Sequence, residues 1–161
     1  MTKLTHITPD GEARMVDVSA KPETARMAIA EGAIRMRSDT HALLKSGNGP
    51  KGDVLGPARI AGILAAKKTA ELIPLCHPIP INSIAIEFTF DEIDIAIRAR
   101  AEVRTFGRTG AEVEALTATL IALLTIYDMA KAVDRAMVIG EVRLLEKSGG
   151  VRGHYRADGN V

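Results

Sequence analysis

The first third of the chain shows two helical patterns behind an irregular start. Residues 1–20 carry no sustained hydrophobic period, which predicts a flexible arm with at most a short extended piece. Over residues 22–36 the apolar positions fall on one side of a helix and a proline suits its first turn, so we expect a helix there. Ser38 or Asp39 could cap a second, shorter helix that ends at the glycine-rich loop 46–50.

The middle of the chain passes from a helical pattern to two strand patterns. Apolar residues recur at helical spacing over residues 60–72, which predicts a helix. Residues 73–80 hold three prolines, and these exclude a helix and impose an extended, stiff path. Apolar and polar residues alternate over 84–90 and again over 95–103, on either side of a turn at 91–94. The alternation predicts an antiparallel hairpin.

The last third predicts one long helix and a final strand. The glycines of residues 107–110 break the strand pattern, and Thr109 is a suitable cap for a helix from about 111 to 135. A strand is expected over 137–146, followed by a tight turn at 147–150. Helices, a hairpin, a long helix and a closing strand together predict an α+β domain, an antiparallel sheet covered by helices, with a ferredoxin-like topology preferred.

The composition limits the chain to one domain and a narrow range of partners. With 161 residues and 47% hydrophobic content, residues 1–161 fit a single domain with its own core. A formal net charge of +1 does not suggest a nucleic-acid surface, and 3% aromatic residues with no Trp leave little for base stacking. We therefore expect no nucleic-acid partner, and any anionic ligand must be bound locally.

Cysteine content and hydropathy indicate a cytoplasmic protein without a membrane partner. Cys76 is the single cysteine, so no internal disulfide can form, and the amino terminus lacks a secretory-signal pattern. No apolar run approaches the roughly 20 residues needed to cross a bilayer. The long helix is nevertheless apolar over much of its circumference, which suggests that subunits associate through it.

Charged side chains stand at both ends of the long helix. Asp128 and Lys131 are three residues apart and share a face, which most often makes a solvated ion pair; burial would make the pair useful in proton transfer. Glu112 and Glu114 complement the helix dipole whether or not they bind a ligand. Glu114 and Asp128 are about 21 Å apart at the usual helical rise. If both ends serve one small-molecule site, we expect the ends to come from different subunits.

The segment around Cys76 and His77 is the other place where chemistry is expected. Adjacent residues on an extended chain point to opposite sides, so a catalytic pair of Cys76 and His77 is geometrically poor, and a structural role is favoured for the cysteine. His77 serves either turn formation or contact with a ligand. The other histidines, His6, His41 and His154, lack metal-ligand spacing, so no metal site is expected.

Three further features of the sequence are compatible with binding of an anionic ligand. Lys51 and Lys147 each precede a glycine-containing loop, although solvated surface lysines are the commoner interpretation of either alone. The loop 107–110 precedes a helix amino terminus, where anions bind well. It does not match the pattern of a phosphate-binding P-loop.

Read in order, these pieces resemble the MoaC family, the cyclic pyranopterin monophosphate synthases. The resemblance extends over residues 15–153. The segments that carry it are 15–19 (MVDVS), 51–54 (KGDV), 58–63 (ARIAGI), 65–69 (AAKKT), 72–78 (LIPLCHP), 114–117 (EALT), 124–129 (LTIYDM) and 147–150 (KSGG).

The resemblance implies a lyase of molybdenum cofactor biosynthesis. It would convert a cyclised dihydro-GTP (3',8-cyclo-7,8-dihydro-GTP) into cyclic pyranopterin monophosphate and release pyrophosphate. The resemblance also implies a homohexamer, a trimer of dimers of ferredoxin-like subunits, with active sites shared across the dimer interfaces. No cofactor is required by the sequence, and whether Mg²⁺ accompanies the phosphates is left open.

The same resemblance implies roles for individual residues. Asp128 is similar to the family's catalytic carboxylate and Lys131 to its acid–base partner, with Lys51 and His77 as further members of the reaction centre. The positions that match substrate contacts are Leu75, Cys76, His77, Glu112, Val113 and Glu114. The positions similar to cations that hold the phosphates or the opposite end of the ligand are Lys21, Arg26, Arg104 and Lys147.

One departure and two alternatives accompany the resemblance. The family is expected to carry Met where this chain has the shorter and stiffer Val113, so a backbone contact there would survive and a side-chain contact would be altered. A non-catalytic nucleotide- or pterin-binding module is the main alternative, since ferredoxin-like domains often serve that way. A scaffold subunit that assembles through its apolar helix is the other.

Overall fold

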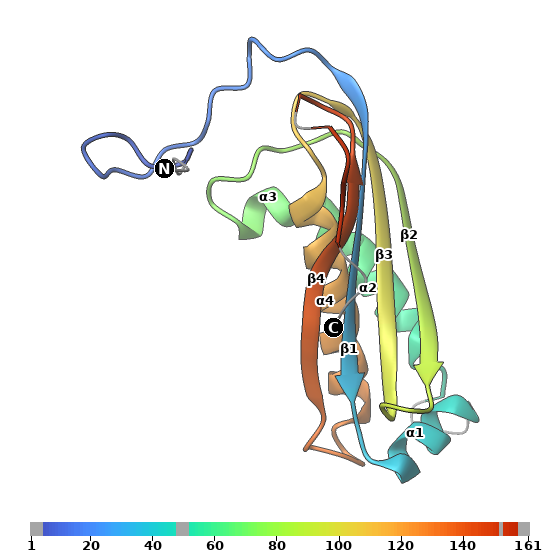
Figure 1. Cartoon of the computed structure of the whole chain (residues 1–161). Coiled ribbons are helices and arrows are strands. Elements are labelled where there is room, and N and C mark those ends of the chain that lie inside the picture. The colour runs from blue at the N-terminus through green and yellow to red at the C-terminus, as the bar shows by residue number, and fades with distance from the viewer. Residues whose placement is uncertain (1–4, 48–51, 152, 158–161) are drawn as a thin grey trace.

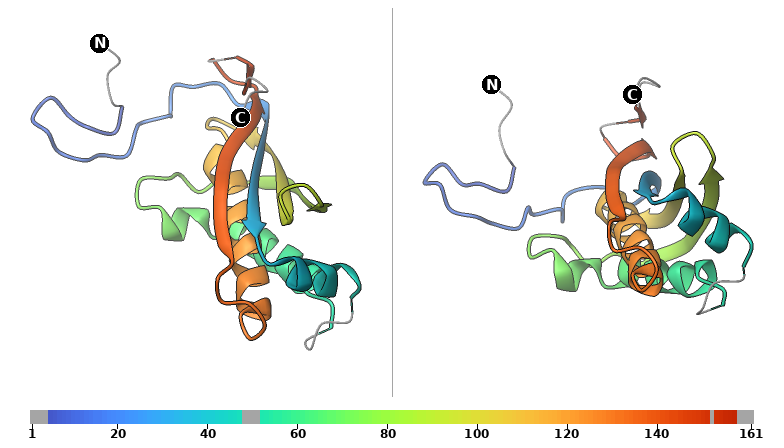
Figure 2. Two further views of the ribbon diagram at one scale, coloured as in Figure 1. Left: turned by 60° about the horizontal axis from the view of Figure 1, so that its bottom comes forward. Right: turned by 90° about the horizontal axis from the view of Figure 1, so that it is seen from below.

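Two helices cover one face of a single antiparallel sheet, and a long arm extends from one end of it (Figures 1 and 2). The structure is a computed structural model that describes residues 5–47, 52–151 and 153–157. Its strands are β1 (Thr24–Arg35), β2 (Ile81–Asp91), β3 (Ala96–Gly107), β4 (Val138–Ser148) and β5 (Tyr155–Arg156). Its helices are α1 (Ser38–Lys45), α2 (Leu55–Lys67), α3 (Thr69–Leu72) and α4 (Glu112–Ala130).

The sheet has the strand order β2-β3-β1-β4-β5. β1 and β3 lie in the middle and pair with each other along their whole length, from Thr24↔Gly107 to Arg35↔Ala96. A β1-α2-β2-β3-α4-β4 succession with β1 and β3 central is the ferredoxin-like arrangement. The expected α+β, ferredoxin-like fold is therefore confirmed.

β1 occupies residues for which the sequence pattern predicts a helix, and that prediction over 22–36 is wrong. Ala, Met and Glu in this segment have good helix propensity, but pairing with strands on both sides overrides that weak preference. Ala28, Ile29 and Ala30 are all buried although they follow one another in sequence. A strand buried on both faces lacks the alternation that identifies a half-exposed one.

Gly32 lies inside β1, at a point where another element comes close. A Cβ atom there would lie 2.9 Å from Leu123 Cδ1 and 3.2 Å from Thr119 Cγ2, both on α4. Glycine in a strand interior often marks such a close approach of another element. The contact lets α4 lie directly against the centre of the sheet.

The other expected elements are present, with changes at their ends. The predicted hairpin is formed by β2 and β3, and α2, α4 and β4 lie where helices and a strand were expected. α4 ends at Ala130 rather than near residue 135. Within residues 5–20 the arm contains one isolated bridge, between Ile7 and Ala13, in agreement with the expected lack of regular structure.

The predicted capping residues do not cap their helices. Ser38 is the first residue of α1, and neither α1 nor α4 has a side-chain hydrogen bond from its N-cap position, so Asp39 and Thr109 do not fill that role. The backbone N–H of Arg37, just before α1, donates instead to Asp134 Oδ2 at 2.9 Å. A distant carboxylate thus binds the amide that precedes the helix.

The main core lies between the sheet and α4, and its largest fully buried apolar side chains are Ile34, Ile97, Leu123 and Ile126. α2 packs on α4 through small residues, and a Cβ atom at Gly62 would lie 2.8 Å from the Ala118 carbonyl oxygen. α4 is long and apolar enough to cross a membrane, but half of its apolar window is buried inside the molecule. That burial is typical of the core helix of a domain.

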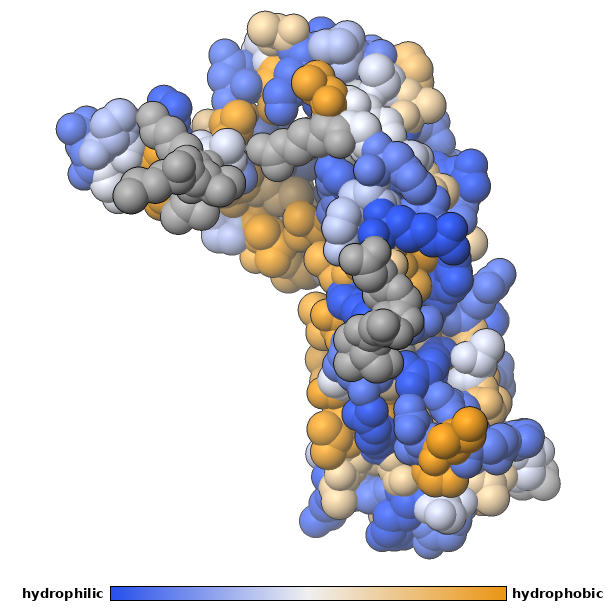
Figure 3. All heavy atoms as spheres, viewed as in Figure 1, coloured by the Kyte–Doolittle hydropathy of each residue, from blue (hydrophilic) through white to orange (hydrophobic). Residues whose placement is uncertain are grey.

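Bulky apolar side chains of the two packed helices face away from this core. Ile60 and Leu64 on α2 and Leu120 and Leu124 on α4 are 45–59% exposed, and together we call them the helix-face patch. Apolar residues also gather on the concave side of the molecule beneath the arm (Figure 3). The helical period over 60–72 is confirmed as α2 and, after a break at Lys68, α3. Its apolar side is only partly covered, since Ile63 packs against the core while Ile60 and Leu64 are exposed.

Candidate functional site

A cavity of about 420 Å³ lies where the arm, the start of β1, the start of α4 and the end of β4 meet. We call it the cationic pocket. It brings together five of the residues singled out in the sequence, namely Lys21, Arg26, His77, Glu112 and Lys147. They come from the arm, β1, the proline-rich segment, α4 and β4, so the fold gathers side chains that are far apart in the sequence.

Positive charge predominates in the pocket. Lys21, Arg26, Arg108 and Lys147 line it together with a single carboxylate, Glu112. Lys147 Nζ lies 3.1 Å from Glu112 Oε1, and both side chains are largely buried. Three further cations, Lys21, Arg26 and Arg108, line the same cavity, and clusters of Arg and Lys suit phosphate groups.

Arg26 is held against the loop that precedes α4. Its Nε donates to the Gly107 carbonyl oxygen and its Nη2 to the Arg108 carbonyl oxygen, each at 2.9 Å. Two glycines make room for the guanidinium group. A side chain on Gly149 would run into the Ala25 carbonyl, and one on Gly150 would run into Arg26 itself. Both glycines also have positive φ, so the turn after Lys147 requires them on two grounds.

Next to the pocket, the half-buried Cys76 forms a pair with the buried Glu114. Cys76 Sγ donates to Glu114 Oε1 at 3.7 Å, while Glu114 Oε2 has no hydrogen-bond partner among the described residues. Burial raises the pKa of Glu114. Burial first, and then the charge of Glu114, raises the pKa of the Cys76 thiol to about 11. The thiol is therefore protonated at neutral pH, which agrees with a structural rather than a nucleophilic cysteine.

Leu75 and Val113 flank this pair but do not line the pocket. Leu75 is half-buried in the proline-rich segment beside Cys76. Val113 is the second residue of α4, and its carbonyl oxygen accepts a hydrogen bond from Thr117 Oγ1 at 2.8 Å. Asp17 on the arm lies close enough to His77 that the histidine contributes, after hydrogen bonds from Ser19, to lowering the pKa of that carboxyl.

Asp128 and Lys131 lie at the opposite end of α4 from Glu112. Lys131 Nζ donates to Asp128 Oδ1 at 2.7 Å, and the two side chains are 52% and 63% exposed. The hydrogen bond to Asp128 and the charge of that carboxylate raise the pKa of Lys131. The pair does not line the cationic pocket of its own chain.

Another predicted residue, Arg104, does not line the pocket. Arg104 lies on β3, is exposed, and pairs with Glu102 Oε1 at 2.5 Å. Lys51 lies outside the described residues. Among the residues that the structure describes, no group of three or more His, Cys, Asp or Glu side chains could hold a metal ion.

Sequence reasoning did not single out Arg108 or the arm residues His6, Val16 and Val18 as part of the site. Arg108 belongs to the loop 107–110, whose position before a helix was the available signal. Val16 and Val18 belong to the segment 15–19 that carries the family resemblance, but no local pattern places them or His6 in a site. They reach the pocket through the path of a segment without regular structure.

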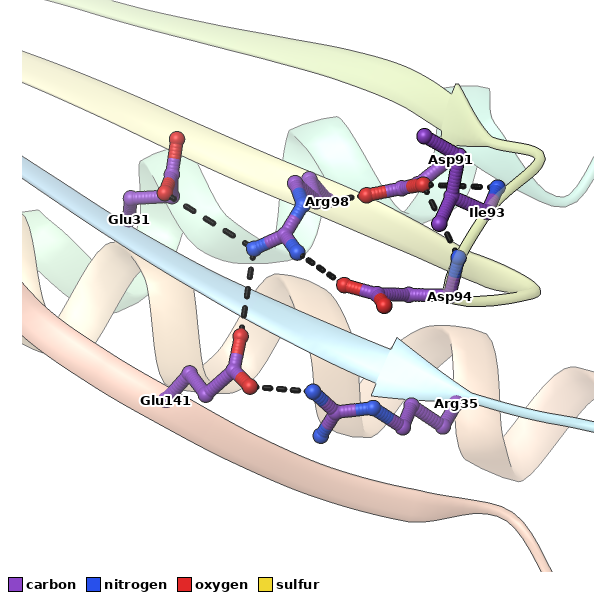
Figure 4. Close-up of polar contacts among 7 residues, drawn as sticks. All are labelled: Glu31, Arg35, Asp91, Ile93, Asp94, Arg98 and Glu141. Carbon is purple, nitrogen blue, oxygen red and sulfur yellow. Dashed lines mark hydrogen bonds and ion pairs between the residues drawn. The ribbon is translucent and has the colours of Figure 1, made fainter. Parts of the chain in front are cut away.

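A second cavity, of about 440 Å³, is a network of charges rather than a ligand site (Figure 4). The Arg98 guanidinium lies 2.8 Å from Asp91, 2.6 Å from Asp94 and 3.1 Å from Glu141. Glu141 also pairs with Arg35 on β1. These ion pairs tie β1, β3, β4 and the hairpin turn together, and they neutralise Arg98 within the chain.

The chain matches the model of the MoaC family over residues 15–150. It is 59% identical over 157 residues to the cyclic pyranopterin monophosphate synthase of Novosphingobium aromaticivorans, covering 98% of this chain and 99% of that protein. It is 58% identical over 153 residues to the proteins of the same name from Brucella ovis and Brucella melitensis, covering 95% of this chain and 93% of each. With most of its length matched by the family model, the chain belongs to the MoaC family.

Proposed function

We propose that this chain is a cyclic pyranopterin monophosphate synthase, a lyase of molybdenum cofactor biosynthesis. Its substrate is a cyclised dihydro-GTP, and its products are cyclic pyranopterin monophosphate and pyrophosphate. The observation that carries the proposal is the likeness, over nearly the whole length of both chains, to relatives that bear this name. Its location in the cytoplasm is part of the proposal and rests on the single cysteine, which is compatible with a reducing compartment.

The cationic pocket supports the phosphate half of this reaction. A triphosphate carries several negative charges, and four cations from separate elements converge on a cavity of about 420 Å³. Expulsion of pyrophosphate builds charge on the leaving oxygen, and cations fixed in advance stabilise that charge without reorganisation. His77 lines the same cavity, where an imidazole can donate or accept a proton near neutral pH.

The proposal includes a site completed by a second copy of the chain. Asp128 and Lys131 are exposed at the far end of α4, about 21 Å along the helix from Glu114. The helix-face patch lies on α2 and α4 and is exposed in the single chain. If two copies pair their α4 helices in opposite directions, the patch becomes buried and the Asp128–Lys131 pair of one copy comes near the pocket of the other. Three such dimers would make the hexamer.

Within the shared site, Asp128 and Lys131 carry the proton transfers. Burial at the interface would remove water from the ion pair, and desolvation favours the neutral form of a lysine. Lys51, His77 and the substrate contacts at Leu75, Val113 and Glu114 belong to the same proposal. The chain supplies acids, bases and cations of its own, and Mg²⁺ bound with the phosphates is compatible with them.

The test is turnover of enzymatically prepared cyclised dihydro-GTP, followed by pyrophosphate release and pterin formation. Wild type should turn over, while Asp128→Ala and Lys131→Ala should not. Lys45→Ala, which breaks an exposed ion pair with Glu92 away from the pocket, is the matched control and should remain active. No turnover by wild type would leave the non-catalytic binding module as the better interpretation.

A further inference from the structure

Arg26 and Arg108 both line the cationic pocket, but their surroundings differ. We propose that Arg26 is a positioning residue that fixes the loop 107–110, and that Arg108 is the arginine that binds a phosphate group of the ligand. This division of roles rests on the proposed function for the identity of the ligand. It departs from the expectation that Arg26 itself holds the phosphates.

Arg26 has its hydrogen-bonding capacity directed into the protein. Its Nε and Nη2 atoms donate to the carbonyl oxygens of Gly107 and Arg108 at 2.9 Å. The third guanidinium nitrogen, Nη1, lies against the backbone of Gly150. The planar fork of an arginine suits two adjacent carbonyl groups, and a lysine cannot reproduce that geometry. Arg26 therefore acts on the loop mainly through shape and direction.

Arg108 differs from Arg26 in the surroundings of its side chain. Its backbone is fixed by Arg26, whereas its side chain is exposed. The nearest carboxylate, Glu23, lies 3.6 Å from Arg108 Nε, beyond the range of a good hydrogen bond, and is itself exposed. Such a pair is weak and exchanges readily for a stronger anion. A phosphate oxygen at the same place would form shorter, charge-assisted bonds.

Two cations of the pocket are each paired with a carboxylate of the same chain. Glu23 pairs loosely with Arg108, and Glu112 pairs more closely with Lys147. The oxygens of these carboxylates occupy positions that phosphate oxygens can take over. The ligand class that fits is a linear polyphosphate attached to a nucleoside-sized group. A chain of phosphates could reach Arg108 and Lys147 together because both line one cavity.

The first experiment distinguishes the effect of the geometry of the Arg26 guanidinium group from the effect of its charge. Binding of inorganic tripolyphosphate to the full chain is measured by calorimetry for wild type, Arg26→Lys, Arg108→Ala and Arg108→Lys. Arg26→Lys keeps the charge and loses the fork, so the loop and Arg108 lose their position. Binding should weaken about tenfold, as for loss of the charge-assisted bond from Arg108 to phosphate. Arg108→Ala should weaken binding by a similar factor, and Arg108→Lys should recover most of that loss.

Hydrogen exchange of the loop 107–110 provides a readout that charge alone does not change. Arg26→Lys should speed amide exchange in the loop, whereas Arg108→Ala should not. If Arg26→Lys instead binds tripolyphosphate as wild type does and the loop stays protected, the positioning role is wrong.

The second experiment predicts a gain rather than a loss. Glu23→Gln removes the competing carboxylate and should tighten tripolyphosphate binding about threefold, a fraction of one exposed ion pair. Glu71→Gln on α3, an exposed acid with no ion pair among the described residues, should leave binding unchanged. The gain should vanish in Glu23→Gln combined with Arg108→Ala, because the two side chains act on each other.

Turnover of the cyclised dihydro-GTP is measured in parallel. Failure of the proposed synthase activity can then be distinguished from failure of the proposed phosphate contact of Arg108. Wild type that turns over while Glu23→Gln and Arg108→Ala leave tripolyphosphate binding unchanged would overturn the role of Arg108 and retain the synthase. Wild type that binds tripolyphosphate through Arg108 without turnover would retain the phosphate site and overturn the synthase. Loss of binding in Arg108→Ala with the gain in Glu23→Gln supports the inference.

Discussion

Lys147 Nζ lies 3.1 Å from Glu112 Oε1, so an ion pair joins the end of β4 to the first residue of α4 across the cationic pocket. The contact orients Lys147 toward the cavity before any ligand arrives. It also holds together two elements that approach the pocket from different directions.

Removing this cation should impair substrate binding more than the chemical step. Lys147→Ala should raise KM for the cyclised dihydro-GTP about tenfold, because one charge-assisted contact to phosphate is lost, with a smaller change in kcat. The dependence of KM on salt should also become shallower, since fewer charges attract the ligand. Steady-state kinetics at low and high ionic strength measure both effects. Lys45→Ala, outside the pocket, is the control, and an unchanged KM in Lys147→Ala would contradict the prediction.

The buried carboxyl of Glu114 should make stability depend on pH. Burial raises its pKa above the ordinary glutamate value of 4.5, so the folded state binds more protons than the unfolded state between the two pKa values. Its contribution to the free energy of unfolding is thus favourable at acidic pH and declines as pH rises above 4.5. Glu114→Gln stays neutral at every pH. Its stability relative to wild type should therefore increase from acidic to neutral pH.

Urea unfolding at several pH values, at one protein concentration, measures this difference. Glu71→Gln is the control, because an exposed acid on α3 should give a difference independent of pH. A constant difference for Glu114→Gln as well would show that the carboxyl is not destabilised by burial.

Close packing between β1 and α4 predicts a large effect from a single methyl group. Gly32→Ala would place a Cβ atom 2.7 Å from Val142 Cγ2 on β4 and 2.9 Å from Leu123 Cδ1 on α4, closer than such atoms pack. The change should cost about 1–3 kcal/mol of the free energy of unfolding. Gly140→Ala on β4 is the matched control, since a Cβ atom there has nothing within 4 Å. Chemical denaturation of the two variants measures the difference. Equal stabilities would mean that β1 and α4 are not in close contact.

The helix-face patch should be required for both assembly and turnover. Leu124→Glu puts a charge into the proposed interface and should yield smaller particles in sedimentation velocity, with loss of synthase activity. Ile93→Glu changes an apolar residue that is 93% exposed on the hairpin turn, so it should affect neither property. Full activity in monomeric Leu124→Glu would contradict the shared site.

Whether the hydrophobic pattern predicts a strand correctly depends on how many faces of that strand are buried. The hairpin was predicted because β2 and β3 alternate between a covered and an open face, as in Arg98, Arg100 and Glu102 opposite buried alanines. β1 was missed because its neighbours conceal both faces. The residues that α4 approaches, Gly32 above all, become informative only when the packing partner is known.

Part of the candidate site could also be predicted from the sequence. Lys21, Arg26, His77, Glu112 and Lys147 were identified through resemblance to a family, and the structure places them around one cavity. Spacing along the chain could not reveal this, because five separate segments contribute. Arg108 was missed because the position of the loop 107–110 before a helix does not show which of its side chains enters a site. Arg104 was named, yet its side chain lies away from the pocket and pairs with Glu102.

The inner side of α2 is built largely from Ala58, Gly62, Ala65 and Ala66, whereas Ile60 and Leu64 are exposed. In an isolated copy these two apolar side chains are therefore exposed to water rather than packed in the core. If activity needs a second copy, catalysis would vary more steeply than linearly with the amount of chain present. A newly made copy would remain idle until it met another, so dilution alone would switch the enzyme off, without unfolding it.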